Sequence, residues 1–107
     1  MITDPRFTKL AKLLVEYSTS LKKGDRVLID MADVPDEFTV ELIRAARAVG
    51  AIPFVEVRHT RINRELLRGS TEDYGAQVRD MELFRMKRMQ AYIAMRGSNN
   101  ANENADV

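Results

Sequence analysis

Four carboxylates follow one short apolar run of the sequence. Asp30, Asp33, Asp36 and Glu37 come directly after the run 27–29. Carboxylates there could hold a magnesium ion or act as an acid/base pair, because open α/β folds place ligands at the carboxyl ends of their strands. The alternative is structural: Asp33 caps the next helix, and Asp36 and Glu37 offset its dipole. Strand-to-helix turns favour such residues without any ligand, so we expect the structural role.

The same turn argues against a nucleotide site. A phosphate-binding turn needs glycines that let backbone N–H groups approach the phosphate at a helix N-terminus. This turn contains no glycine, and the acids at its helix start repel phosphate. A fold of the G-x-G-x-x-G or P-loop kind is therefore not expected.

One histidine is present, and cysteine is absent. As a metal ligand His59 would need partners, and only Glu56 lies close in the sequence, so we expect a partly exposed residue at a strand end. No G-x-S-x-G pattern supports a serine nucleophile. The lack of cysteine excludes disulfides and thiolate chemistry and fits a reducing cytoplasm. We predict no catalytic and no metal-binding residue in this chain, and the substrate-binding residues stay unassigned.

A basic cluster lies in the middle of the chain, and three of its members share a helical face. RNA or phosphate binding is one interpretation of this cluster. The segment lacks interleaved aromatic residues, and 17 basic against 16 acidic residues leave a net charge of +1, so no global field attracts nucleic acid or an anionic membrane. We expect a solvated face. The cluster consists of Arg58, Arg61, Arg64 and Arg68.

The elements that would position these residues alternate between helix and strand. Asp4 and Pro5 start a first helix, and Gly50 ends a second one where a left-handed residue is wanted. Apolar spacing predicts helices over 5–20, 36–49 and 71–89, with Ser70 or Thr71 capping the last, and a short polar helix over 61–68. β-branched and apolar runs predict strands near 26–31, 53–57 and 91–95.

This order predicts an α/β fold: a small three-layer domain with a parallel sheet of about three strands and a βαβ unit. A typical sheet has about five or six strands, so we expect an incomplete piece of a larger domain. The domain is predicted to span 1–97, with 98–107 as a polar tail or truncated loop. No apolar run approaches the about 18 residues of a membrane helix. The two open edges of such a sheet predict self-association into a dimer or higher oligomer, with Phe84, Met86 and Met89 in the contact. The alternative is that Met81, Met86, Met89 and Met95 fill gaps in the core.

Several segments resemble one enzyme family. The resemblance is carried by residues 10–18 (LAKLLVEYS), 21–29 (LKKGDRVLI), 42–55 (LIRAARAVGAIPFV) and 91–99 (AYIAMRGSN). In order and spacing these resemble the N-terminal part of the thermophilic metallopeptidases, of the leucyl aminopeptidase-like aminopeptidase T and aminopeptidase S type. The likeness covers most of residues 7–99.

The resemblance implies a parent enzyme that removes amino acids from peptide N-termini. In that family an N-terminal α/β domain precedes a catalytic domain holding two divalent metal ions, zinc, cobalt or similar. None of the family's metal-ligand positions maps onto this sequence, so the chain itself is expected to be structural and non-catalytic. Its implied partners are its own C-terminal catalytic domain and a second copy of the chain. The alternative is a free-standing α/β interaction or RNA-binding module.

Overall fold

The computed structural model describes residues 4–97 and has an α/β fold. Its three parallel strands lie in the order β2-β1-β3, so the first strand is central. The predicted fold class and parallel sheet are confirmed, whereas the predicted tail 98–107 lies outside the described residues. The strands are β1 (Arg26–Ala32), β2 (Ile52–Arg58) and β3 (Ala91–Arg96), and the helices are α1 (Pro5–Leu13), α2 (Asp36–Ala48), α3 (Thr60–Leu67) and α4 (Glu72–Met86).

The first predicted helix is correct at its start and wrong at its end. The Asp4 side chain accepts a hydrogen bond from the Arg6 N–H, and Pro5 occupies the first helical position. The α-helix stops at Leu13 and continues as a π-helical segment, Leu14–Ser18. The Thr19 hydroxyl donates to the carbonyls of Leu14 and Val15 at 3.0 and 3.1 Å, so a side chain satisfies groups that a longer α-helix would have paired.

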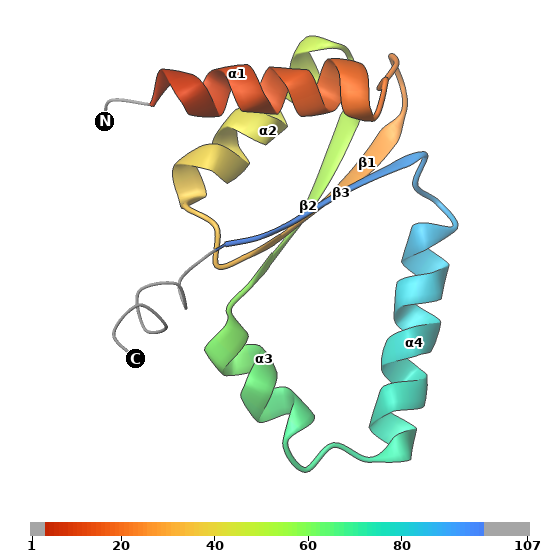
Figure 1. Cartoon of the computed structure of the whole chain (residues 1–107). Helices are drawn as coiled ribbons and strands as arrows, with labels where there is room; N and C mark the ends of the chain where they lie inside the picture. The colour runs from red at the N-terminus through yellow and green to blue at the C-terminus, as the bar shows by residue number, and fades with distance from the viewer. Residues whose placement is uncertain (1–3, 98–107) are drawn as a thin grey trace.

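One face of the sheet, the covered face, carries the hydrophobic core. Alternation along β1 sends Val27, Ile29 and Met31 toward α1 and α2, where all three are buried. Phe38 and Leu42 of α2 complete this layer at 2% and 0% exposure. Figure 1 shows α1 and α2 together on this side of the sheet.

The opposite face, the open face, is only partly covered. Leu28, Asp30 and Ala32 of β1 point to this face. Leu28 pairs with Phe54 of β2 on one side and with Tyr92 of β3 on the other, so these two aromatic residues lie on the same face. Leu28 is buried between its two neighbours, but Phe54 and Tyr92 remain 42% and 45% exposed. The sheet therefore presents aromatic surface to solvent on this side.

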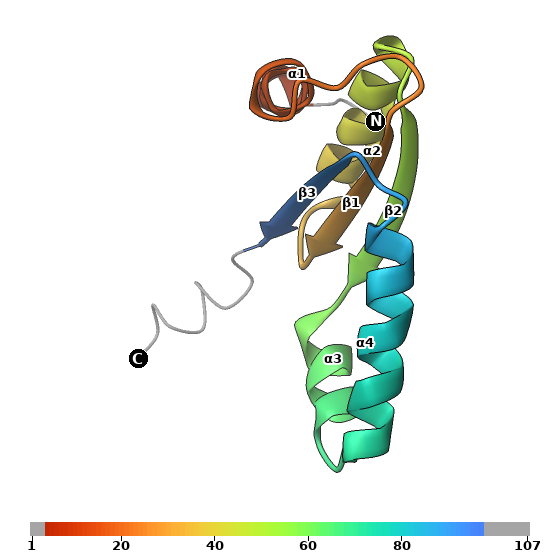
Figure 2. The ribbon, with the colours of Figure 1, turned by 90° about the vertical axis from the view of Figure 1, so that its right-hand side faces the viewer.

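The predicted three-layer arrangement requires helices on both faces of the sheet. Helix α4, however, does not cover the open face along its length. Thr71 caps it by accepting from the Tyr74 N–H, but neither α3 nor α4 contains a buried residue. Both helices project beyond the carboxyl ends of the strands (Figure 2). The radius of gyration is 15.8 Å, against about 13 Å for a compact domain of this length. None of the helices within residues 4–97 has the length and apolar character needed to cross a membrane.

Candidate functional site

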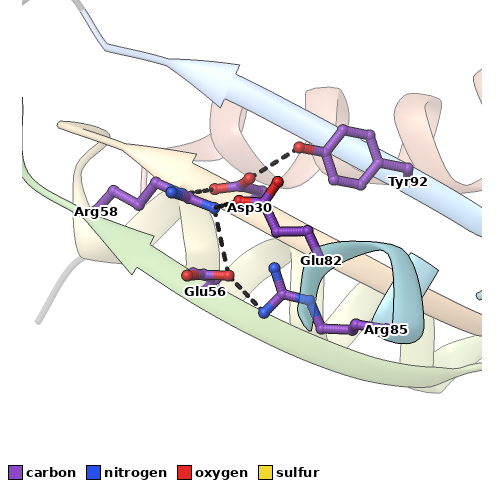
Figure 3. A network of polar contacts seen from close by, with 6 residues as sticks. All are labelled: Asp30, Glu56, Arg58, Glu82, Arg85 and Tyr92. Atoms are coloured by element: carbon purple, nitrogen blue, oxygen red, sulfur yellow. Dashed lines mark hydrogen bonds and ion pairs between the residues drawn. The ribbon is translucent and has the colours of Figure 1, made fainter. Parts of the chain in front are cut away.

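A network of charged side chains lies on the open face and joins all three strands. Asp30 of β1 accepts hydrogen bonds from Arg58 Nε at 2.9 Å and from the Tyr92 hydroxyl at 2.8 Å. Figure 3 shows Asp30 between these two partners. The Asp30 side chain is 13% exposed. The hydrogen bond from Arg58 to Asp30 outweighs burial and raises the pKa of the guanidinium above its usual range. Asp30 is thus a paired structural carboxylate.

The network continues to α4 through two further carboxylates. Arg58 Nη2 lies 3.5 Å from Glu56 and 3.9 Å from Glu82, and Arg85 Nη1 lies 2.5 Å from Glu56. Glu82 and Arg85 belong to α4, so these ion pairs tie its last turns to β2. Two guanidinium groups pair with three carboxylates here, and this arrangement is suited to holding α4 and the strands in position.

Sequence reasoning singled out Asp30, Glu56 and Arg58 but missed Tyr92 and Arg85. One feature of the predicted strands could have indicated this network. Asp30 and Glu56 occupy paired positions of adjacent parallel strands, so two carboxylates come together on one face and require cations between them. The arginines that meet this need come from β2 and α4.

The pKa of Tyr92 provides a test of the network. Burial and the hydrogen bond to Asp30 raise it above 10.0. A raised folded-state pKa stabilises the fold below the unfolded value of about 10, and this contribution is lost as pH rises through the folded value. We expect Asp30→Asn to lower the pKa of Tyr92, measured from its ring NMR signals, because the adjacent anion is removed. An unchanged pKa would show that the contact with Asp30 is absent in solution.

The acidic loop does not form the predicted cap on α2. The N-cap of α2 is Pro35, without a side-chain hydrogen bond. Asp33 instead adopts a positive φ of 57° and turns its carboxylate toward the start of α3. It accepts from the Thr60 N–H at 3.2 Å and from the Thr60 hydroxyl. The prediction assigned Asp33 to α2 because α2 is the next helix in the sequence. The parallel pairing of β1 and β2 brings the start of α3 equally close to Asp33, so the prediction was wrong. Asp36 and Glu37 lie in the first turn of α2, as predicted.

We expect Asp33→Ala to destabilise the protein by about 1 kcal/mol through loss of this cap on α3. Asp36→Ala is the matched control, since it removes a carboxylate from the first turn of α2 and is expected to cost less. Thermal unfolding of both variants measures the difference. A larger loss for Asp36→Ala would contradict the assignment of the cap. Magnesium is expected to leave the melting temperature of the wild type unchanged.

The other residues proposed from the sequence are spread apart. His59 directly follows β2 as the N-cap residue of α3. Its side chain is 60% exposed and lies 3.9 Å from Asp33, consistent with the expected exposed residue at a strand end. Arg58 is drawn into the network, so the basic cluster is divided. Arg61, Arg64 and Arg68 remain exposed, as predicted for a solvated face.

The described residues do not fit the two-metal site that the family resemblance implies. Within residues 4–97, no group of three or more His, Asp or Glu side chains is arranged to hold a metal ion. No catalytic step through a metal is therefore assigned to residues of this chain.

A groove lies between the two projecting helices, and Glu56 and Arg58 of β2 line it from the open face. Its volume is 560 Å³, and its apolar wall combines Leu66 and Leu67 of α3 with Tyr74, Val78 and Met81 of α4. These α4 residues recur at helical spacing and form one apolar face. Met81 is nevertheless 68% exposed and Leu67 63% exposed, so this surface has no covering layer within the described part of the chain.

No protein-family model and no curated protein matches this chain. Among solved structures the chain is similar to "Wild-type AmpT from Thermus thermophilus", with a TM-score of 0.53 and 25% sequence identity. Over the matched residues, the fold of this chain is similar to that of one part of AmpT. The match covers 63% of this chain but 17% of the AmpT chain, so this chain spans a small part of the length of its structural relative.

Proposed function

We propose that this chain is the N-terminal α/β part of a metal-dependent aminopeptidase, in which it supports the catalytic domain and helps to bound its substrate cavity. The observation that carries the proposal is the similarity to AmpT, at 25% identity over 63% of the chain. AmpT is a thermophilic aminopeptidase, of the type that the sequence motifs resemble. Hydrolysis and the two metal ions would belong to the parent enzyme.

The hydrophobic core covers only one face of the sheet, which supports the proposal that this chain contacts a catalytic domain. The open face leaves Ile52 and Phe54 exposed at 48% and 42%, and the groove beside α3 and α4 leaves Met81 exposed at 68%. Large apolar side chains exposed in this way on one side of a domain are typical of a contact surface. More than four fifths of AmpT lies outside the matched part, so the occupant we assign to this surface is the C-terminal catalytic domain of the same polypeptide. A homodimer in the cytoplasm is part of the proposal.

The decisive experiment is to sequence the gene beyond the codon for Val107 and to express its complete product. We expect the reading frame to continue into a domain rich in glutamate and histidine. The complete product should release amino acids from aminoacyl-nitroanilides with zinc, cobalt or manganese, whereas the 107-residue chain should not. A stop codon directly after Val107, or metal-dependent turnover by the 107-residue chain, would contradict the proposal. The stop codon would favour a free-standing interaction or RNA-binding module.

A matched pair of variants tests the docking surface in the complete product. Phe54→Glu places a charge on the open face and is expected to reduce peptidase activity by weakening domain contact. Tyr17→Glu is the control, because Tyr17 is 74% exposed and lies in the π-helical segment outside the open face. Activity and thermal unfolding are measured for both. Equal activity of the two variants would argue that the open face does not contact the catalytic domain.

A further inference from the structure

A hollow of 390 Å³ lies on the open face at the carboxyl ends of β1 and β3, beside the groove between α3 and α4, with which it shares Arg58 and Asn63. Its size is within the range of about 300–1,000 Å³ typical of small-molecule pockets. Ala32 of β1 and Ala94 of β3 lie at its floor, where larger side chains would fill the space. Tyr92 and Asn63 also line it. The Asp30 carboxylate lines it as well, and both of its oxygens are taken up, one by Arg58 and one by the Tyr92 hydroxyl. The hollow therefore combines small apolar residues with an aromatic ring, an amide and a paired carboxylate.

Two arginines flank this floor because of the strand register. Ala32 pairs with Arg58 on one side and with Arg96 on the other, so the three residues form one row across the sheet. Neighbouring strands lie about 4.8 Å apart, and side chains at paired positions point to the same face. The alanine thus leaves an open position between two guanidinium groups.

The two arginines of this row differ in their partners. Arg58 is offset by Asp30 at 2.9 Å and by the more distant Glu56 and Glu82. Arg96 is exposed, and no carboxylate of residues 4–97 lies within ion-pair distance of it. A guanidinium group presents a planar fork of N–H donors that matches the oxygens of a carboxylate or a phosphate. Arg96 is therefore the arginine of this hollow whose donors are not paired with a carboxylate of residues 4–97.

The topology gives an independent reason to expect a ligand here. All three strands are parallel, but β2 lies on one side of β1 and β3, the next strand in the sequence, lies on the other side. In open parallel sheets, ligands usually bind at the carboxyl ends of the strands where the strand order changes side in this way. The loop after β1 leads to α2 on the covered face, so it leaves the hollow on the open face accessible (Figure 1).

From these features we infer that the hollow binds a small organic molecule carrying one oxyanion, with Arg96 as its charged anchor and Tyr92 as an apolar wall. The inference goes beyond the proposed function and does not depend on it. It concerns this chain's own residues and is tested without peptidase activity. The shared chemistry is the oxyanion, and separate probes distinguish a carboxylate from a phosphate.

The test is an NMR titration of the 107-residue chain with benzoate, phenyl phosphate and the neutral benzamide. We expect saturable shifts of the Arg96 and Ala94 amide signals with at least one of the two anions and none with benzamide. The anion that binds more tightly shows whether the site prefers a carboxylate or a phosphate. Arg96→Gln should weaken binding about tenfold or more, the loss expected for a hydrogen bond to a charged group.

Two further variants separate a site from general attraction to positive charge. Ala32→Leu keeps both arginines but fills the hollow, and it should also abolish the saturable shifts. Arg61→Gln removes an exposed arginine of α3 that does not line the hollow, and it should bind as the wild type does. Absence of saturation with both anions, equal shifts with benzamide, or equal losses in Arg61→Gln and Arg96→Gln would overturn the inference.

Discussion

Replacing Leu42 with alanine is expected to lower the free energy of unfolding by about 2–5 kcal/mol. Leu42 is 0% exposed and lies in the single core cluster with Ile29 and Phe38. A chain of this size has a total stability of about 5–15 kcal/mol, so this one change removes a large part of it. Urea denaturation followed by circular dichroism measures the loss.

Leu83→Ala in α4 is the matched control for this substitution. The same atoms are removed, but Leu83 is 55% exposed and α4 has no buried residue. A surface change of this kind is expected to stay within about 0.5 kcal/mol. If Leu83→Ala costs as much as Leu42→Ala, then α4 packs into a core in solution, and the open face is covered by this chain itself.

The covered half of the fold could be predicted from the sequence because its signals are local. Pro5 after Asp4 marks the start of α1, and Gly50, with a φ of 82°, follows α2 where the left-handed residue was expected. Phe38 and Leu42 have the helical spacing from which the helix over 36–49 is predicted, and both are buried. These features act within a few residues of one another, so tertiary structure did not alter them.

The candidate site was predicted less well because its contacts join distant parts of the chain. Asp33 was assigned to the nearest helix, but pairing of β1 with β2 brings its carboxylate to Thr60. Tyr92 reaches Asp30 only because β3 lies beside β1, on the side away from β2. Neither contact follows from helical or strand periodicity, since both depend on strand order.

The exposure of α4 was unpredictable for a different reason. Tyr74, Val78 and Met81 have the spacing of a buried face, and they do line the groove toward α3. Periodicity identifies which side of a helix is apolar, but it does not say whether the covering surface belongs to the same stretch of chain. This half of the molecule is where we place the missing partner.

A final prediction concerns the close approach that shapes the end of β3. A Cβ atom on Gly97 would lie 1.8 Å from the carbonyl oxygen of Asp33 and 2.5 Å from its carbonyl carbon. Both are backbone atoms, and the Gly97 N–H donates to the Ala32 carbonyl at 2.6 Å, so neither segment can move aside without losing that bond. We expect Gly97→Ala to lower the free energy of unfolding by about 1–3 kcal/mol, as overpacking does.

Gly75→Ala makes the same chemical change where space exists. A Cβ there meets only the guanidinium of Arg79, at 3.3 Å, which is the far end of a flexible side chain. Because alanine favours a helix by up to about 1 kcal/mol over glycine, Gly75→Ala should increase helicity without destabilising the fold. Thermal unfolding of the two variants should therefore differ in sign. Equal stability of Gly97→Ala and the wild type would mean that the loop at Asp33 lies farther from β3. The end of β3 at Arg96 would then be free to shift, and the row of Arg58, Ala32 and Arg96 would no longer be held in place.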